Sequence, residues 1–210
     1  MSAEALRLEP TRERRDTATL GMWVFLATEL MFFGALFLGY LHVRLGDPAG
    51  VAEASHHTHE WLGTINTAVL LTSSFAMALA VMAANAGARR AARGWLVATA
   101  LLGLAFLAIK GTEYVLEWRD GLVPGLHFAV PDPHGTTRLF FDLYFLMTGV
   151  HAVHLTIGIA IVASLVLRLR HPGLAPGRSQ AIELTGLYWH FVDVVWVFLY
   201  PLFYLVDLSR

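Results

Sequence analysis

Eight side chains with acid–base chemistry lie inside long apolar stretches of this sequence or close to their ends. They are Glu29, Lys110, Glu113, His151, His154, Glu183, His190 and Asp193. Hydrocarbon solvates charge poorly, so an ionisable residue in a membrane span is rare and marks a candidate functional position. Such residues can carry protons, form ion pairs or, in the case of histidine, ligate a metal or haem.

Glu29 lies about ten residues into its apolar run, which corresponds to a depth of roughly 15 Å in a helix. A carboxylate at that depth either takes up a proton or finds a hydrogen-bond donor. It could therefore handle protons or contact lipid, or it could be a buried acid with a structural role. The residues alone leave both interpretations open.

Lys110 and Glu113 are three residues apart, and this spacing places both side chains on one face of a helix. We interpret them as an ion pair near the outer end of a span, with the lysine stem extended so that its amino group reaches the membrane interface. This interpretation is favoured over a role in transport.

The same spacing relates His151 to His154, and imidazole is a common ligand of metals and haem. Hydrogen bonding between helices is the favoured interpretation, because polar side chains join helices within bilayers. His190 and Asp193 also share a face, and Glu183 lies seven residues before His190. The second pair could relay protons or hold two helices together, and both roles stay open.

Five apolar segments must position these residues, at 19–44, 61–86, 94–118, 137–168 and 182–207. About 20 helical residues cross the hydrocarbon core, so each segment is long enough to span a membrane. A barrel is excluded because the segments lack the alternating pattern of roughly ten-residue membrane strands. The sequence therefore predicts an all-α fold, an integral membrane bundle of five transmembrane helices.

The composition agrees with this class and excludes others. Hydrophobic residues make up 56% of the 210, and charged residues only 15%, against about 25% in average soluble domains. This excess of apolar residues excludes a disordered chain. The net charge of −1 without a basic cluster excludes nucleic acid as a partner, and the absence of cysteine excludes thiolate metal sites.

The placement of arginine predicts the orientation. With the N-terminus in the cytoplasm, ten arginines lie on the inner side and four on the outer side. The inner set is Arg7, Arg12, Arg14, Arg15, Arg89, Arg90, Arg93, Arg168, Arg170 and Arg178, and the outer set is Arg44, Arg119, Arg138 and Arg210. The positive-inside rule therefore predicts an N-in, C-out topology. We expect a polar cytoplasmic N-terminal arm at 1–18 and a single five-helix membrane domain at 19–210.

Five short motifs occur in order along the chain. They are TELMFFGALFLGY around Glu29, Asn66-Thr67 followed by LLTSS, Glu113-Tyr114, Thr148-Gly149-x-His151-x-x-His154, and YWHFVDVVW at 188–196. Together these motifs resemble those of subunit III of the haem–copper cytochrome c oxidases. The resemblance extends over about residues 19 to 207, which is nearly the whole chain.

The resemblance implies a helical subunit that carries no haem and no copper of its own. Such a subunit docks on the catalytic haem–copper subunit I of a complex that also contains the copper-bearing subunit II. The complex oxidises cytochrome c, reduces oxygen to water and pumps protons across the bacterial plasma (inner) membrane. The chain would be part of an enzyme without being catalytic itself.

The resemblance also implies that the subunit binds phospholipid, supports proton uptake and protects the catalytic subunit during turnover. We therefore expect the eight ionisable residues to make polar contacts between helices or with lipid headgroups. None of them is expected to be a redox ligand. A Glu29→Gln variant should assemble normally but change the stability of the complex during sustained turnover.

Two departures from the family pattern matter. Seven-helix members carry two further N-terminal helices, which form one wall of a lipid-filled cleft. This sequence starts at the equivalent of the third helix, so we expect the cleft to be open or closed by another subunit, for example a fused extension of the catalytic chain. Lys110 stands where many relatives have glutamine, which favours a pair with Glu113 over a plain lipid contact.

Several alternatives remain. Five-helix forms also occur in quinol oxidases and beside nitric-oxide reductases, but Glu29 and the Tyr-Trp-His-Phe-Val-Asp string are more similar to the cytochrome c branch. An independent proton or ion transporter is an alternative of another class, although the sequence lacks the paired inverted repeats of many transporters. A haem-binding membrane enzyme that uses the histidines is a third alternative.

Overall fold

Helices make up all the regular structure in the described part of the chain, which confirms the predicted all-α class. The computed structural model describes residues 3–56, 58, 60–123, 128, 135–169 and 178–205, and of residues 3–12, 14 and 178 only the backbone. The helices are α1 (Ala3–Gly46), α2 (Pro48–Ser55), α3 (Glu60–Asn85), α4 (Arg89–Arg119), α5 (Thr136–Arg168) and α6 (Arg178–Tyr204).

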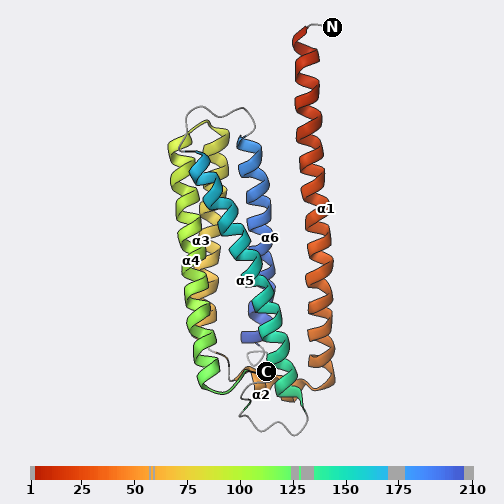
Figure 1. The fold of residues 1–210 in the computed structure, drawn as a ribbon. Coiled ribbons are helices and arrows are strands. Elements are labelled where there is room, and N and C mark those ends of the chain that lie inside the picture. Colours follow the sequence, from red (N-terminus) through yellow and green to blue (C-terminus); the bar gives the residue numbers. More distant parts are fainter. Residues whose placement is uncertain are drawn as a thin grey trace.

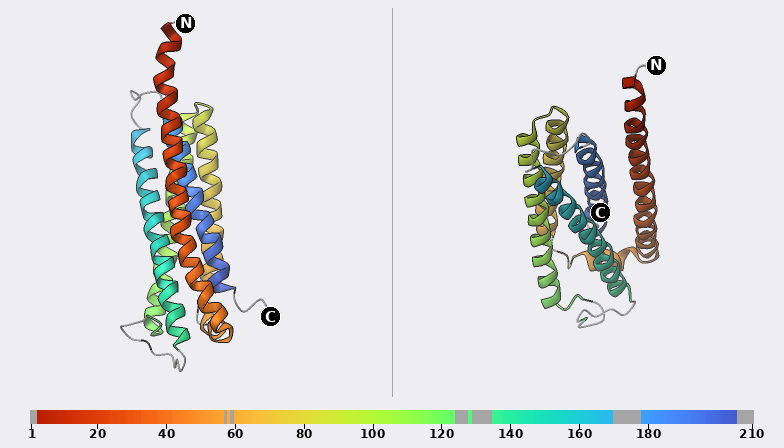
Figure 2. Two further views of the ribbon diagram at one scale, coloured as in Figure 1. Left: turned by 90° about the vertical axis from the view of Figure 1, so that its right-hand side faces the viewer. Right: turned by 45° about the horizontal axis from the view of Figure 1, so that its top comes forward.

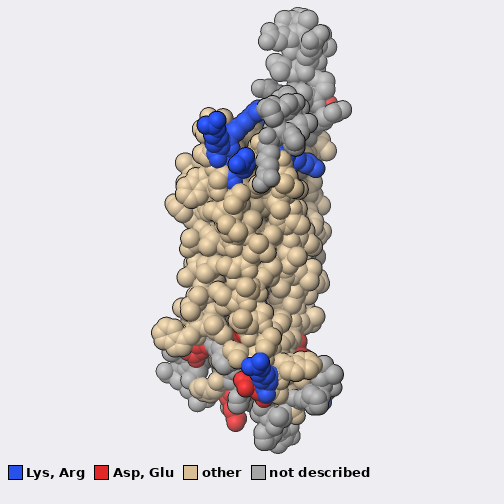
Figure 3. Space-filling model, turned by 60° about the vertical axis from the view of Figure 1, so that its left-hand side comes forward, with Lys and Arg blue, Asp and Glu red and all other residues tan. Residues whose placement is uncertain are grey.

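Five of these helices are long and apolar enough to cross a membrane, as predicted. Large apolar side chains such as Met31 and Phe75 are 76% and 66% exposed, an arrangement that suits lipid rather than water. Figure 3 shows a band without charged side chains between one end where basic side chains gather and another where acidic and basic side chains are both exposed. The N-in, C-out orientation stays a prediction.

The arm predicted at 1–18 and the connection after the first span both contain helix. Helix α1 begins at Ala3, because the arm at 1–18 is rich in Ala, Leu, Glu and Arg, which are good helix formers. Helix α2 forms within the connection after α1, where Asp47 accepts a hydrogen bond from the Gly50 amide at 3.0 Å and Pro48 occupies the first turn. Residues 1–2 and 206–210 of the predicted domains lie outside the described residues.

The bundle has a four-helix body and one flanking helix. Helices α3 and α4 form an antiparallel hairpin, α6 packs on α3, and α5 packs on both α4 and α6. Helix α1 stands at the edge, and its main contacts are with α5, α6 and α2 (Figure 1). Its 44 residues give it a length of about 66 Å, and its first turns extend past the ends of the other helices (Figure 2).

Glycines in the left-handed conformation end both helices of the hairpin. Gly87 has φ of 73° and Gly121 has φ of 71°, a region that other residues rarely adopt. At the second of these turns the Leu122 amide donates to the Glu117 carbonyl at 3.0 Å. This bond satisfies a carbonyl of the last turn of α4 and fixes the part of α4 that carries Glu117.

Trp189 of α6 occupies the centre of the four-helix body and is fully buried. Its indole Nε1 donates to Ser73 Oγ of α3 at 3.1 Å. A Cβ added at Gly103 of α4 would lie 2.9 Å from the Trp189 ring, and one added at Gly158 of α5 would lie 3.2 Å from it. Small residues on α4 and α5 therefore admit one large side chain that contacts three other helices.

We predict that Gly103→Val destabilises the bundle by about 1–3 kcal/mol, because the added methyl groups overlap the Trp189 ring in a packed core. The measurement is the midpoint of thermal unfolding in detergent. Gly111→Val is the matched control, because it lies on the same helix and a Cβ there meets nothing within 4 Å. Equal losses in the two variants would contradict this description of the core.

Candidate functional site

The predicted site residues do not converge on one place. The structure divides most of them among a charged cluster between α4, α5 and α6, a pair that joins α1 to α5, a hydrogen bond between α3 and α6, and a polar pocket near the start of α6. One histidine stands apart among aromatic rings. The predicted site residues therefore form several separate groups in the bundle.

The lysine cluster consists of Lys110, Glu113 and Glu117 of α4, Tyr144 of α5 and Tyr204 of α6. Lys110 Nζ donates to Glu113 Oε2 at 3.1 Å, to the Tyr144 hydroxyl at 2.6 Å and to the Tyr204 hydroxyl at 2.7 Å. Its Nζ also lies 4.4 Å from the centre of the Tyr144 ring. The cluster thus joins three helices through one ammonium group.

The predicted pair of Lys110 and Glu113 is confirmed, but the prediction that the lysine reaches the interface is wrong. Lys110 is only 2% exposed and Glu113 is fully buried. The physical reason is that a carboxylate and two phenols surround the ammonium inside the bundle and take the place of water.

Glu117 belongs to the cluster although the sequence analysis did not single it out. Its Oε1 lies 2.5 Å from the Tyr144 hydroxyl, which is also 2.9 Å from Glu113 Oε1. A signal was present in the sequence, because Lys110, Glu113 and Glu117 follow the spacing of one helical face. The contributions of Tyr144 and Tyr204 depend on helix packing, which the sequence pattern does not specify.

Glu29 of α1 and His154 of α5 form the second cluster. His154 Nε2 lies 3.1 Å from Glu29 Oε2, and the two side chains are 16% and 18% exposed. His154 Nδ1 donates to the Val150 carbonyl at 2.9 Å, so the other ring nitrogen faces the carboxyl group. One proton must therefore lie between the histidine and the carboxyl group. The predicted interhelical hydrogen bond of His154 is confirmed.

A pocket of about 450 Å³ adjoins this pair. It lies between α1, α5 and α6, and its lining is mostly apolar, with Met22 and Phe25 from α1, Ile157 and Ile161 from α5, and Leu184 from α6. Tyr188 also lines it, and its hydroxyl donates to the His154 carbonyl at 2.9 Å. The pocket is therefore mostly apolar, with the polar pair of Glu29 and His154 at its wall.

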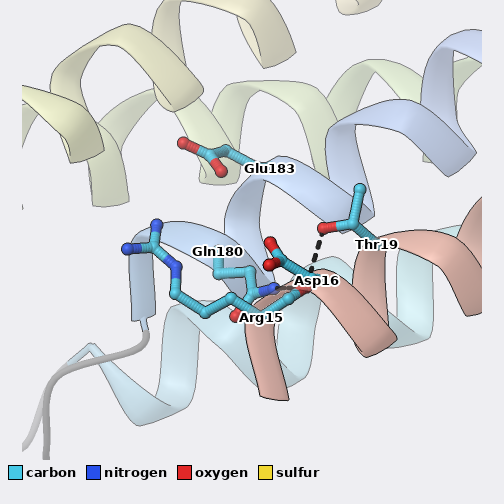
Figure 4. Close-up of a pocket in the computed structure, with 5 residues that line it drawn as sticks. All are labelled: Arg15, Asp16, Thr19, Gln180 and Glu183. Atoms are coloured by element: carbon cyan, nitrogen blue, oxygen red, sulfur yellow. Dashed lines mark hydrogen bonds between the residues drawn. The ribbon is translucent and has the colours of Figure 1, made fainter. Parts of the chain in front are cut away.

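A smaller polar pocket of about 260 Å³ lies between two of these helices, α1 and α6, and contains Glu183. Arg15, Asp16 and Thr19 line it from α1, and Gln180 lines it from α6 (Figure 4). Gln180 Nε2 donates to the Arg15 carbonyl at 2.7 Å, and this bond ties α6 to α1. Side chains of both charge signs thus surround one cavity.

His190 and Asp193 of α6 face helix α3. His190 Nδ1 lies 2.7 Å from Ser74 Oγ, which is a hydrogen bond between helices. The Ser74 side chain is also adjacent to the buried Asp193 carboxyl group. The sequence left two roles open for this pair, a proton relay and a link between helices. The observed contact of His190 is a link between helices.

His151 does not make the interhelical hydrogen bond that the sequence predicted. It is fully buried, and neither ring nitrogen has a hydrogen-bond partner among the described residues. Its ring centre lies 5.6 Å from that of Phe106 and 5.2 Å from that of Trp196. The imidazole therefore packs against aromatic rings of α4 and α6.

Other motif residues bond to one another across the bundle. Trp196 Nε1 of α6 donates to Thr67 Oγ1 of α3 at 3.0 Å. The hydroxyl groups of Tyr114 on α4 and Thr148 on α5 lie 2.6 Å apart. The motifs read from the sequence are therefore largely sets of residues that join neighbouring helices. Within the described residues, no three His, Cys, Asp or Glu side chains gather as a metal site would require.

Comparison with known proteins identifies the family. A family model for cytochrome c oxidase subunit III matches residues 2–207. The chain is 32% identical over 190 residues to quinol oxidase subunit 3 of Bacillus subtilis (strain 168), an alignment that covers 90% of this chain and 87% of that protein.

Relatives that are named as cytochrome c oxidase subunits are about as similar to this chain as the Bacillus subtilis protein is. The chain is 32% identical over 203 residues to cytochrome c oxidase subunit 3 of Thermostichus vulcanus, with 96% of this chain and 94% of that protein covered. It is 34% identical over 192 residues to the protein of the same name from Synechocystis sp. (strain ATCC 27184 / PCC 6803 / Kazusa), with 91% and 76% covered. The chain therefore belongs to the cytochrome c oxidase subunit III family of haem–copper oxidases, in which haem and copper are held by other subunits.

Proposed function

We propose that the chain is the non-redox subunit III of a bacterial terminal oxidase that oxidises cytochrome c, reduces oxygen to water and pumps protons. It binds the catalytic subunit I and the copper-bearing subunit II in the plasma (inner) membrane and catalyses no step itself. The observation that carries this proposal is the family match over residues 2–207, together with family motifs whose side chains join helices.

The proposed work of the chain is to stabilise the catalytic subunit, to hold phospholipid and to support proton uptake. The two pockets between α1 and α6 support lipid binding, because a polar pocket and an apolar pocket lie along the same pair of helices. Arg15 and Met22, which line one pocket each, are seven residues apart, or about 10 Å along α1. A phospholipid would place its headgroup near Arg15 and an acyl chain against Met22 and Ile157.

The charges that line the smaller polar pocket favour the headgroup of a zwitterionic lipid. Arg15 can pair with a phosphate, and Asp16 and Glu183 can pair with an ammonium group. Deeper in the same groove, Glu29 and His154 would contact the lipid from the side. Their partial exposure supports this role, because neither group is sealed inside the protein.

A quinol oxidase is the second candidate for the complex. The relative from Bacillus subtilis carries that name and is as similar to this chain as the relative from Thermostichus vulcanus. We propose cytochrome c as the donor because Glu29 and the motif that begins at Tyr188 resemble those of cytochrome c oxidases, and the matching family model describes the same class.

We predict that deletion of the gene for this chain leaves membranes that consume oxygen with reduced cytochrome c but lose this activity within fewer turnovers. The reason is that the catalytic subunit would lack its stabilising partner and bound lipid. The measurement is oxygen uptake over time, with reduced cytochrome c and with a quinol as separate donors. A defect confined to quinol oxidation would move the chain to the quinol oxidases, and unchanged kinetics with both donors would contradict a supporting role.

We predict that Glu29→Gln leaves assembly of the complex intact but increases the rate at which it inactivates during sustained turnover. The amide keeps the size of the side chain and can still hydrogen-bond to His154, but it removes the acidic group that can exchange a proton with the imidazole and weakens the contact with bound lipid. The measurement is the inactivation rate of the purified complex, together with its phospholipid content. Glu53→Gln is the matched control, because Glu53 is exposed on α2. An unchanged rate with normal lipid content would refute this role for Glu29.

A further inference from the structure

The hydroxyl group of Tyr144 has more polar neighbours than its one hydrogen and two lone pairs can serve with ordinary charges. Its oxygen lies 2.6 Å from Lys110 Nζ, 2.9 Å from Glu113 Oε1, 2.5 Å from Glu117 Oε1 and 3.1 Å from the Tyr204 hydroxyl. The ammonium must donate in its contact. The phenol is then left with one hydrogen to place between two carboxyl groups.

The other hydrogens of the cluster are already placed. The three hydrogens of Lys110 point to Glu113, Tyr144 and Tyr204. The Tyr204 hydroxyl donates to Glu113 Oε1 at 2.5 Å. If both glutamates were ionised, one carboxylate oxygen would face the Tyr144 oxygen without a hydrogen between them. That contact would be repulsive at either observed distance.

The charges lead to the same result. Lys110 is 2% exposed and Glu113 and Glu117 are fully buried, so one cation would face two carboxylates inside the bundle. The charged groups that act on Glu117 are Lys110, Glu113 and Asp120. A net negative charge without a counter-charge in such a place is strongly unfavourable.

Further ionisable groups surround the cluster from each packed helix. Tyr114 lies on α4, His151 on α5 is within range of the Lys110 charge, and Tyr204 belongs to α6. The neutral forms of these groups add no positive charge. Glu117 Oε2 supplies an independent indication, because it is buried and has no hydrogen-bond partner among the described residues. The carbonyl oxygen of a neutral acid tolerates this better than an oxygen of a carboxylate.

We infer that Glu117 is a neutral carboxylic acid, so that the lysine cluster is a buried site that binds one proton. The acid hydrogen on Oε1 is donated to the Tyr144 oxygen, and Tyr144 donates its own hydrogen to Glu113. The positive charge of Lys110 and the negative charge of the ionised Glu113 then cancel. The Tyr144 oxygen has one hydrogen in each of its contacts with Lys110, Glu113 and Glu117. Loss of the proton would leave a net negative charge and would break the hydrogen bond from Glu117 of α4 to Tyr144 of α5.

The test is infrared difference spectroscopy of the purified oxidase complex that contains this chain. We expect Glu117→Gln to remove one band of a protonated carboxyl group and no carboxylate band. The complex should also keep its midpoint of thermal unfolding, because the amide of glutamine can donate to Tyr144 as the acid does. Glu60→Gln is the matched control, since Glu60 is exposed and its loss should remove carboxylate absorption only. Removal of a carboxylate band by Glu117→Gln, with the acid region unchanged, would overturn the inference.

Tyr144→Phe provides a second measurement that keeps Glu117 in place. Removing the phenol takes away the acceptor of the acid hydrogen, so the acid band should remain but shift to higher frequency. If the acid band stays at the same position, the proton does not lie between Glu117 and Tyr144. Exchange into heavy water should shift the same band in the unmodified complex, and a band without any shift would show that another group is its source.

Discussion

Polar groups inside a membrane favour partners among one another, and this constraint shapes many of the contacts between the helices. Lys110 is the strongest case, because its ammonium group is nearly inaccessible and has three oxygen partners on three helices. Removal of any one partner would leave a buried charge without sufficient compensation. Weaker versions of the same constraint recur at Trp189 with Ser73 and at Trp196 with Thr67, where indole groups donate to α3. Hydrogen bonds thus join the helices together with the close packing of large side chains against small ones.

The bundle divides its ionisable groups between its interior and one face. The lysine cluster is sealed between α4, α5 and α6, whereas Glu29 and His154 lie on the side where α1 flanks the body. The same side holds both pockets between α1 and α6. This division fits a subunit with a rigid interior and one face for lipid. The family to which the chain belongs holds its haem and copper in other subunits.

Much of this arrangement could be predicted from sequence, because its signals are local. Hydrophobic runs defined the five spans to within a few residues at most ends, and spacing along α4 indicated the pair of Lys110 and Glu113. The misses concern contacts between helices. The inward direction of Lys110 depends on Tyr144 and Tyr204, which come from two other helices, and His151 is enclosed by rings of α4 and α6. Helix α2 had a local signal in Asp47 and Pro48, but its eight residues are too few for a helical pattern of apolar residues to stand out.

The central claim is that this chain works as the subunit III of an oxidase and not as an independent protein. The most direct measurement is affinity purification of the tagged chain from its native membrane in mild detergent, with mass spectrometry and a reduced-minus-oxidised spectrum of the eluate. We expect a large haem-bearing membrane subunit in the eluate, with the absorbance of haem a and with cytochrome c oxidation. Recovery of the chain alone, without a haem-bearing partner and with proton flux in liposomes, would contradict it and would favour a transporter.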